Sequence, residues 1–297
     1  MGQTCSCNDA GDQEQEVRME NNNKKQQQKS NANYQESQQQ KGNKLQSQSN
    51  VNNGPTPTDE LVYIEELVFE NGAVYKGFMK DGMRHGQGTQ VWPDGAKYEG
   101  EWKNNQANGH GKFWHADGDI YEGEWKDDKA NGHGVYLHVN GARYEGNWRN
   151  DLQDGFGIET WSDGSKYEGY YKEGTKHGKG KYIWNDQSMY DGEWFENKIN
   201  GYGVYEWPDG RRYDGQWKDN NMHGRGLYTW RDGRKYEGEY VNDRKDGYGT
   251  YIWADGRQYR GNWKNGKQHG EGYYKSANGE EKRGLWEEGK RVKWLDE

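Results

Sequence analysis

The sequence predicts an all-β fold, an elongated single-layer antiparallel β-meander that follows a disordered amino-terminal tail. Three observations predict it. Tyrosine recurs every 23 residues from Tyr75 to Tyr259, so the chain is built of repeats. Within a repeat, Tyr-x-Gly-x-Trp and Gly-x-Gly-x-aromatic alternate with the period of two that β-strands have. Glycine (45), Trp (15) and Tyr (23) are abundant while apolar residues make up 29%, which favours tight turns and rings packed on bare backbone.

The first part of the chain, residues 1–60, is rich in Gln, Asn, Ser and Lys, with runs such as QQQKSNANYQESQQQKGNK. Such a segment buries too little apolar surface to offset the entropy of ordering, so we expect it to be disordered. Pro55 and Pro57 mark the linker to residues 61–297. That second part holds nine full units of 23 residues and a degenerate tenth, in which Lys282 takes the tyrosine slot and Trp286 stays in register.

Each unit is expected to supply two strands, and turns such as WPDG (Trp92 to Gly95) join one unit to the next. Proline at the second position favours a type I turn. A three-residue loop that ends in a left-handed glycine places the tyrosine and tryptophan columns of neighbouring strands on one face. A two-residue loop would place them on opposite faces. We therefore predict the three-residue loop.

The predicted face of rings and glycines is the architectural face, because 13 of the 15 tryptophans fall in just two slots of the repeat. About twenty strands spaced ~4.8 Å apart give a ribbon of about 95 Å, which sheet twist coils into a trough. This aromatic face is represented by Tyr98, Trp102, Tyr121, Trp125, Tyr144, Trp148, Tyr190, Trp194, Tyr213, Trp217, Tyr259 and Trp263.

The opposite face is predicted to be charged. First strands read basic, acidic, acidic, basic, as in Lys97, Glu99, Glu101 and Lys103, which we interpret as a solvated cross-strand charge ladder. The second strands add a partial aliphatic stripe that includes Val135, Ile158, Val204 and Leu227. A single-layer sheet with two such faces is expected to dimerise, to cap itself or to bind a protein partner.

These motifs resemble the MORN (membrane occupation and recognition nexus) repeat, whose pattern is close to YxGxWxxGxxHGxG, over roughly residues 61–297. The resemblance implies an elongated β-meander with one hairpin per unit. MORN proteins include membrane–membrane tethers, radial-spoke-head components, apicomplexan cytoskeletal organisers and the non-catalytic part of plant phosphatidylinositol phosphate kinases. The resemblance therefore implies scaffolding near membranes, cilia or cytoskeleton. The departures at Met79, Tyr171, Tyr240 and Gln187 are single and conservative.

The amino terminus, MGQTCSC, matches the myristoylation pattern Met-Gly-x-x-x-Ser, with Gly2 and Ser6 in place. One myristoyl chain binds membranes only marginally, so a second signal is expected. The first basic residue is Arg18, which leaves Cys5 and Cys7 as palmitoylation sites for that signal. We predict dual acylation and a location at the cytoplasmic face of a membrane, the plasma or ciliary membrane.

Several other classes are disfavoured. A net charge of −8 weighs against nucleic-acid binding. No apolar run approaches the ~20 residues that span a bilayer, and no secretory signal follows the first methionine. The two cysteines cannot build a disulfide framework. We therefore expect a protein that is neither secreted nor transmembrane.

Candidate chemistry falls into repeat slots. The slot of His85, His177, His223 and His269 holds Asn or Asp in other repeats, so we interpret it as a turn position with positive φ, not as a metal site. The Gly-x-Gly motifs lack the helix that a phosphate-binding loop needs. No catalytic grouping stands apart from the repeat. We predict no enzyme activity, no cofactor and no metal.

Three functions remain. The favoured one is a membrane-anchored scaffold or tether that docks a protein partner on its repeat surface. The second is a phosphoinositide-binding module, which alternating carboxylates weaken because they nearly neutralise the local potential. The third is a targeting or regulatory subunit of a separate lipid kinase. Candidate lipid-headgroup contacts are the basic side chains Lys103, Lys126, Arg149, Lys172 and Lys218.

Overall fold

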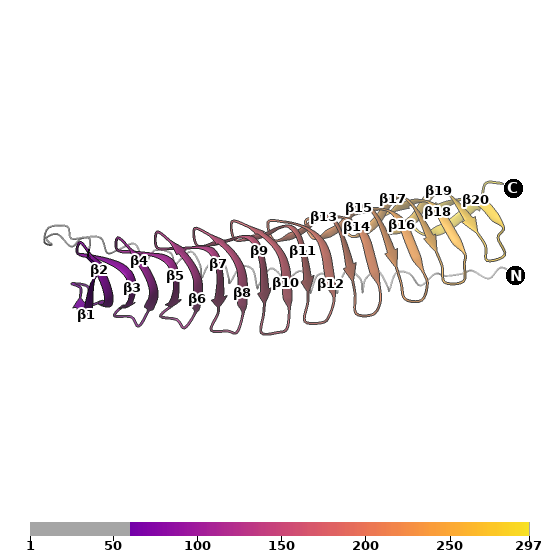
Figure 1. Cartoon of the computed structure of the whole chain (residues 1–297). Coiled ribbons are helices and arrows are strands. Elements are labelled where there is room, and N and C mark those ends of the chain that lie inside the picture. Colours follow the sequence, from indigo (N-terminus) through magenta and orange to yellow (C-terminus); the bar gives the residue numbers. More distant parts are fainter. Residues whose placement is uncertain (1–59, 297) are drawn as a thin grey trace. The chain divides into compact units, whose positions relative to one another are not determined.

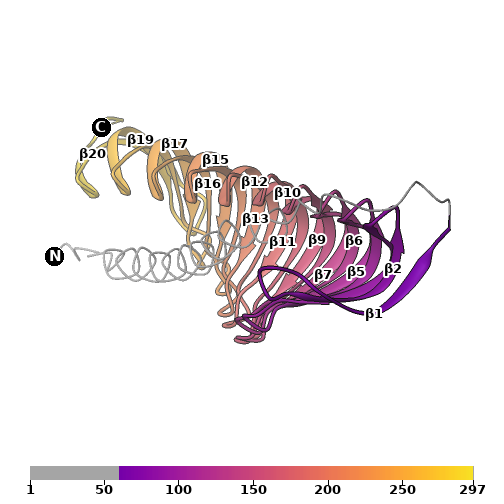
Figure 2. The same cartoon turned by 90° about the vertical axis from the view of Figure 1, so that its left-hand side faces the viewer.

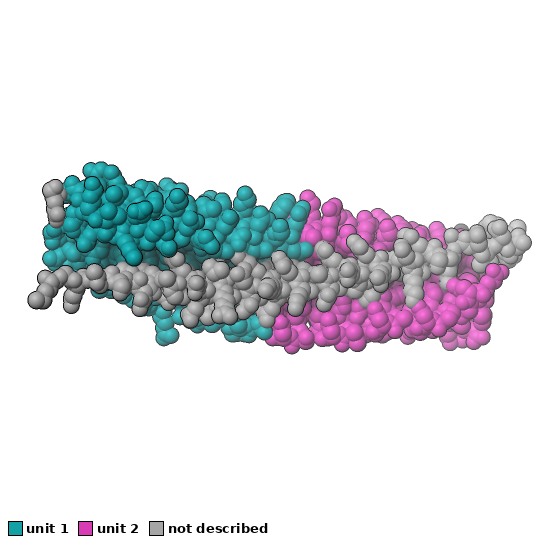
Figure 3. Space-filling model, turned by 180° about the vertical axis from the view of Figure 1, so that it is seen from behind, with its two compact units in different colours: residues 1–32, 179–297 teal, residues 33–178 magenta. Residues whose placement is uncertain are grey.

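The computed structural model describes residues 60–296, in which every regular element is a β-strand (Figure 1). The 21 strands form one antiparallel sheet in which consecutive strands pair and which does not close on itself. This confirms the predicted all-β meander. The described residues fall into two compact units, 60–178 and 179–296, coloured magenta and teal in Figure 3.

The 60–178 unit contains β1 (Val62–Val68), β2 (Val74–Lys80), β3 (Met83–Val91), β4 (Lys97–Lys103), β5 (Gln106–Trp114), β6 (Ile120–Lys126), β7 (Lys129–Leu137), β8 (Arg143–Arg149), β9 (Leu152–Thr160) and β10 (Lys166–Lys172). The boundary between the units lies within β11 (Thr175–Ile183). The 179–296 unit continues with β12 (Met189–Phe195), β13 (Lys198–Glu206), β14 (Arg212–Lys218), β15 (Asn221–Thr229), β16 (Lys235–Val241), β17 (Arg244–Ile252), β18 (Gln258–Lys264), β19 (Lys267–Lys275), β20 (Glu281–Glu287) and β21 (Lys290–Trp294).

The loop between repeats is the predicted three-residue loop. The Trp92 N–H donates to the Ala96 carbonyl at 2.9 Å, and the Gly95 N–H donates to the Trp92 carbonyl at 2.9 Å. Gly95 has a φ of 87°, the left-handed conformation that this loop requires. The resulting register places Gly88 opposite Gly100, so the paired glycines face each other as predicted.

The loop within each repeat has two residues, both left-handed. In the hairpin of β4 and β5 these are Asn104 (φ 50°) and Asn105 (φ 70°). Two left-handed residues give the type I′ turn that matches strand twist. Asn, Asp, Glu and Gly fill these positions along the chain because Asn, Asp and Gly tolerate positive φ best.

The interpretation of the histidine slot as a positive-φ turn position is wrong. His85, the first member of that slot, lies inside β3, and the positive φ of 69° belongs to the following residue, Gly86. The physical reason is a β-bulge. Between Gly77 and Met79 of β2 the register shifts against Arg84 to Gly88 of β3, so the longer strand must accommodate extra residues, and the glycine does so.

The bulge recurs in the hairpins of both units, and the strands of each unit are bent along their length (Figure 2). In the second repeat it lies beside the pair Gly100 and Gly111. The ring of Tyr98 lies over that pair, since a Cβ atom at Gly111 would overlap the Tyr98 hydroxyl. The core of this single-layer sheet therefore consists of rings folded onto bare backbone.

Candidate interaction surfaces

The aromatic face of the sheet is buried. All twelve predicted residues of this face are at most 8% exposed, from Tyr98 at 0% to Trp263 at 8%. Their polar atoms are satisfied by backbone. The indole N–H of Trp102 donates to the Gly88 carbonyl of the preceding repeat at 3.0 Å, and the Tyr98 hydroxyl donates to the Glu101 carbonyl at 3.0 Å. These residues therefore form the core and offer a partner little surface.

The rings also connect one repeat to the next. Tyr98 packs edge-to-face on Trp102 of its own repeat, with centroids 4.9 Å apart, and on Trp125 of the following repeat, at 5.3 Å. Where Tyr171 replaces tryptophan, it still contacts Tyr144 at 5.3 Å and an angle of 90°. Burial raises the pKa of these tyrosines, that of Tyr75 to about 12, so their hydroxyls stay protonated donors at physiological pH.

A second column of tyrosines lies on the longer strand of each repeat. The partners of its buried hydroxyl groups were not predicted from the sequence. The Tyr136 hydroxyl donates to Asp119 Oδ2 at 2.7 Å, and the Tyr205 hydroxyl lies 3.0 Å from Ser188 Oγ. In each case the partner stands 17 residues earlier. Where the column has no hydroxyl, at Gln90, Phe113 and Glu159, the residue 17 positions earlier is alanine: Ala73, Ala96 and Ala142. Buried hydroxyls need a partner, so this pairing was visible in the sequence.

Buried charges replace aromatic or small residues in a few repeats. In the 60–178 unit, Lys176 Nζ lies 3.1 Å from Glu159, with both side chains at most 5% exposed. Tyr171 donates to the same carboxylate at 2.8 Å. In the 179–296 unit, Lys245 Nζ lies 5.2–5.6 Å from the centroids of four rings, those of Trp230, Tyr236, Tyr251 and Trp263. Lys176 and Lys245 occupy one repeat slot, which Arg84 also fills and which holds Ala, Gln, Ile or Met in the other repeats, so the sequence alone did not reveal that these charges are buried.

The carboxylates of the opposite face, here called the polar face, have two different roles. Glu122 pairs with Lys112 of the neighbouring strand at 3.0 Å, as a cross-strand charge ladder predicts, whereas Glu99 pairs with Lys97 of its own strand at 2.7 Å. Glu101 instead accepts the backbone N–H of His110 at 2.9 Å, and Glu124 accepts that of His133 at 3.0 Å. Both bonds satisfy backbone donors that the bulge leaves unpaired in the ladder. Glu101 and Glu124 are therefore structural caps, and the ladder interpretation does not hold for them.

The basic column lies on the same side of the sheet, at the ends of the first strands and beside the two-residue loops. All five predicted lipid contacts, Lys103, Lys126, Arg149, Lys172 and Lys218, are exposed. Arg149 pairs with Asp154 at 2.7 Å, and the loop after Lys126 holds Asp127 and Asp128. Acidic neighbours therefore accompany this column.

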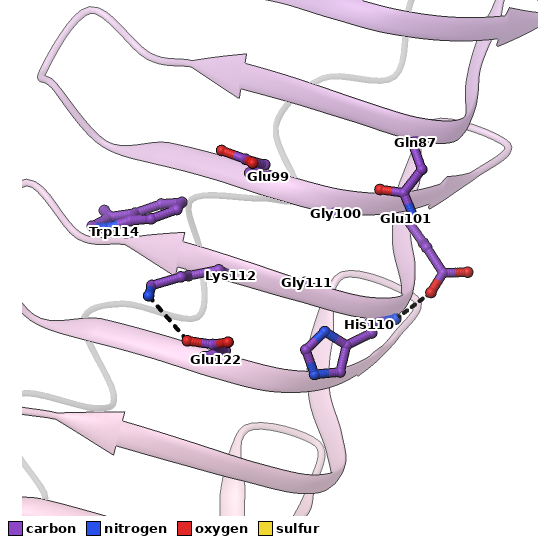
Figure 4. A pocket seen from close by; sticks show the side chains of 9 residues that line it. All are labelled: Gln87, Glu99, Gly100, Glu101, His110, Gly111, Lys112, Trp114 and Glu122. Carbon is purple, nitrogen blue, oxygen red and sulfur yellow. Dashed lines mark hydrogen bonds and ion pairs between the residues drawn. The ribbon is translucent and has the colours of Figure 1, made fainter.

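A cavity of about 290 Å³ opens on the polar face of the 60–178 unit (Figure 4). Lys112 and Glu122 form an ion pair of 3.0 Å inside it. Trp114 lies at its wall, with Lys97 Nζ 4.4 Å from the ring centroid. Trp114 is one of two tryptophans outside the architectural slots. The cavity is lined by Gln87, Glu99, Gly100, Glu101, His110, Gly111, Lys112, Trp114 and Glu122.

Two further features concern the described residues only. Within 60–296, no group of three or more His, Cys, Asp and Glu side chains is arranged to hold a metal ion. Over the same range, no helix has the length and apolarity needed to cross a membrane. The predicted acylation residues Gly2, Cys5 and Cys7 lie outside the described residues.

These surfaces define a class of protein, a repeat array of β-hairpins that share a ring-on-glycine core. The chain belongs to the MORN repeat family, which matches nine consecutive segments: 75–97, 98–120, 121–143, 144–166, 167–189, 190–211, 213–233, 236–256 and 259–281. No curated protein matches the chain.

Solved structures show distant likeness. The wild-type TCP10 domain of Danio rerio CPAP is 13% identical, with 73% of this chain and 96% of that chain covered and a TM-score of 0.38. The SAS-4 TCP domain of Drosophila melanogaster, solved with a proline-rich motif of Ana2, is 12% identical (65% and 92% covered, TM-score 0.30). Virginiamycin B lyase from Staphylococcus aureus is 12% identical (77% and 88% covered, TM-score 0.16). Likeness at this level carries no argument about function.

Proposed function

We propose that this chain is a non-catalytic, membrane-anchored scaffold or tether that docks a protein partner on its repeat surface, at cilia or the cortical cytoskeleton. One observation carries the docking part. The polar face exposes large apolar side chains although the core lies on the other face, among them Phe156 at 42%, Tyr170 at 53%, Tyr202 at 55% and Tyr248 at 49%. Exposed apolar groups on a face of otherwise paired charges are typical of interaction surfaces.

Membrane anchoring in this proposal comes from a myristoyl group on Gly2 and palmitoyl groups on Cys5 and Cys7, because one acyl chain alone binds membranes only marginally. The test compares the full chain with Gly2→Ala and with Cys5→Ser/Cys7→Ser in native cells. We expect wild type in the membrane fraction, Gly2→Ala in the soluble fraction and the double serine variant only weakly bound. An unmodified or acetylated amino terminus in wild type, found by mass spectrometry, would remove the anchor.

Docking is tested by recovering the intact protein from native membranes after mild cross-linking. The proposal expects one protein partner in a stoichiometric amount, and only lipid or nothing would contradict it. A lipid kinase in that fraction would favour the role of targeting or regulatory subunit. A second copy of this chain would identify a homodimer.

The phosphoinositide alternative is favoured by one observation, the row of exposed basic side chains Lys103, Lys126, Arg149, Lys172 and Lys218. The test measures binding of the Gly2→Ala chain, which carries no myristoyl group, to vesicles with and without phosphatidylinositol bisphosphate. Binding that depends on the headgroup and falls in Lys103→Glu/Lys126→Glu supports this alternative. Because carboxylates accompany the basic column, we expect no such dependence.

A further inference from the structure

The polar face of the 60–178 unit carries a continuous row of apolar side chains that runs across its strands. The row follows directly paired positions: Val74 pairs with Val91, Val91 with Lys97, Lys97 with Trp114, Trp114 with Ile120, and Ile120 with Leu137. We call Val74, Val91, Trp114, Ile120 and Leu137 the apolar strip. Lys97 does not interrupt it, because its ammonium group folds over Trp114 at 4.4 Å and its alkyl chain lies within the row.

The strip is accessible and confined to this part of the sheet. Val91 is 42% and Leu137 40% exposed, and Val139, in the loop just beyond, is 74% exposed. The row then becomes polar, since Leu137 pairs with Arg143 and Arg143 with Thr160. In the 179–296 unit the same row begins Met189, Glu206, Arg212 and Thr229, so the strip is not a property of the repeat. The fold therefore does not require apolar residues in this row.

Exposed carboxylates lie beside the strip, in a unit whose net charge is negative. The next row of the polar face runs through Glu99, Lys112, Glu122, Val135 and Glu145, and the side chains of its three glutamates are 56%, 52% and 41% exposed. Their ion pairs with Lys97, Lys112 and Arg143 are surface pairs, which contribute little and exchange partners readily. Residues 60–178 hold 21 Asp and Glu against 13 Lys and Arg, a net charge of −8, whereas residues 179–296 hold 20 against 22. The unit that carries the strip therefore attracts cations.

The length of the strip and the spacing of its side chains indicate which secondary structure a docked partner presents. Five strand steps of ~4.8 Å give a strip of about 24 Å. Successive turns of an α-helix place apolar side chains ~5.4 Å apart, close to the spacing of the strip, and about 16 helical residues cover it. An extended segment places side chains of one face about 6.6 Å apart and matches the spacing less well. The cavity beside Trp114 can take one side chain of such a helix, with Glu99 and Glu122 at its wall (Figure 4).

We propose that the apolar strip and its acidic neighbours form the docking site for a basic amphipathic α-helix of a partner protein. The apolar stripe of the helix packs along Trp114, Ile120 and Leu137. Its lysine and arginine side chains contact Glu99, Glu122 and Glu145 in place of the present ion pairs. This inference rests on the proposed function, since it names the surface and the chemistry of the docked partner.

The test measures binding of a labelled helical probe to the full chain with Gly2→Ala, by fluorescence anisotropy. The probe is a peptide of about 16 residues in which leucine takes one helical face and lysine the other. The matched probe carries glutamate in place of lysine. We expect the lysine probe to bind at least about tenfold more tightly than the glutamate probe, because the strip selects apolar residues and its neighbours select positive charge.

Variants locate the site. Leu137→Gln, which removes the apolar contact without adding charge, is expected to weaken binding of the lysine probe about tenfold, and Glu122→Lys is expected to weaken it about threefold or more. Val241→Gln is the control, because Val241 is similarly exposed, at 43%, and lies in the other unit. It should leave binding unchanged. The fold of each variant is compared with wild type by circular dichroism, and Glu122→Lys remains informative if Leu137→Gln fails to fold.

Equal binding of the two probes, or an equal loss of binding in Val241→Gln and Leu137→Gln, would overturn the proposal. The scaffold function is tested separately. If the cross-linked native partner is recovered equally with wild type and with Leu137→Gln, the scaffold function stands and this surface is not its docking site. If wild type recovers no partner at all, the scaffold itself fails, whatever the probes show.

Discussion

At the scale of single residues, the fold depends on the glycines that face each other on paired strands. A Cβ atom at Gly100 would overlap the backbone of Gly111, and one at Gly111 would overlap the ring of Tyr98. The contact is made by backbone and by a ring held at both ends, so neither can move aside cheaply. Glycine is required here by close approach, whereas in the loops it is favoured by positive φ.

We expect Gly111→Ala to lower the free energy of unfolding by about 2–3 kcal/mol, the cost of forcing extra volume into a packed site. The measurement is chemical denaturation of the full chain. Gly256→Asn is the control, because Gly256 has a φ of 85° and no atom within 4 Å of its Cβ position, and asparagine tolerates this conformation. A loss as large in the control would contradict the role of close packing.

The hydroxyl pairs of the second tyrosine column give a second prediction. Ser188→Ala removes an oxygen that lies 3.0 Å from the buried Tyr205 hydroxyl. We expect it to lower the free energy of unfolding by about 1–3 kcal/mol. The double variant Ser188→Ala/Tyr205→Phe reproduces the natural pair Ala96 and Phe113, and most of the loss should be recovered. Denaturation of the two single variants and the double variant measures the coupling. Strict additivity would mean that the two side chains act independently.

At the scale of elements, the two-residue loops connect neighbouring repeats. Asp128 Oδ1 accepts the Ala107 N–H at 2.7 Å, and the Asp128 N–H donates to the Ala107 carbonyl at 3.1 Å. The same bonds tie Asp151 to Ala130 at 2.8 and 3.0 Å. Each loop thus holds the start of the longer strand in the preceding repeat.

Two substitutions at Asp128 distinguish the effect of losing its side-chain hydrogen bond from the effect of its left-handed backbone conformation. Asp128 has a φ of 65°, so Asp128→Ala loses the bond and places alanine in a left-handed conformation. Asp128→Gly loses only the bond, and glycine occupies this position naturally at Gly174 and Gly266. We expect the alanine variant to be less stable than the glycine variant by about 1 kcal/mol in denaturation experiments. Equal stabilities would show that the conformation is not strained.

The pH dependence of the same loop follows from burial. Burial raises the pKa of Asp128 in the folded chain above its ordinary value, with the Ala107 N–H and Arg84 as opposing influences. A raised folded pKa means that the contribution to stability is present at low pH and falls as pH rises through that pKa. Asp128→Asn keeps an acceptor and does not titrate. Wild type should therefore lose stability relative to this variant between pH 4 and pH 7; a gain over that interval would reverse the sign of the shift.

At the scale of the whole molecule, the sheet is a chain of nearest-neighbour contacts, since each strand pairs only with the strands before and after it in sequence. Stability in such arrays is approximately a sum of terms for repeats and for their interfaces. Removal of one complete unit should therefore be tolerated.

Deletion of residues 121–143, one complete match to the repeat, joins equivalent slots. The product should fold, with β-sheet circular dichroism and a lower denaturation midpoint. Deletion of 121–131 is the control, because it removes half a unit and puts tyrosine and glycine columns out of register. Unfolding of both products, or equal stability of both, would show that the array is not built of independent units.

The sequence by itself determined the strands, their order, the three-residue loop and the face that carries the rings. All of these follow from one constraint: a period of two within strands and of 23 between repeats leaves a single register that puts the repeated tyrosine and tryptophan columns on one side. Tertiary structure decided which groups those rings and carboxylates contact. The bulge at Gly86, the bond from Glu101 to the His110 N–H and the Lys176–Glu159 pair each depend on where the backbone bends and what a neighbouring repeat places there. The apolar strip was also decided by tertiary structure, because Val91, Trp114 and Leu137 lie far apart in the chain and are brought into one row only by strand pairing.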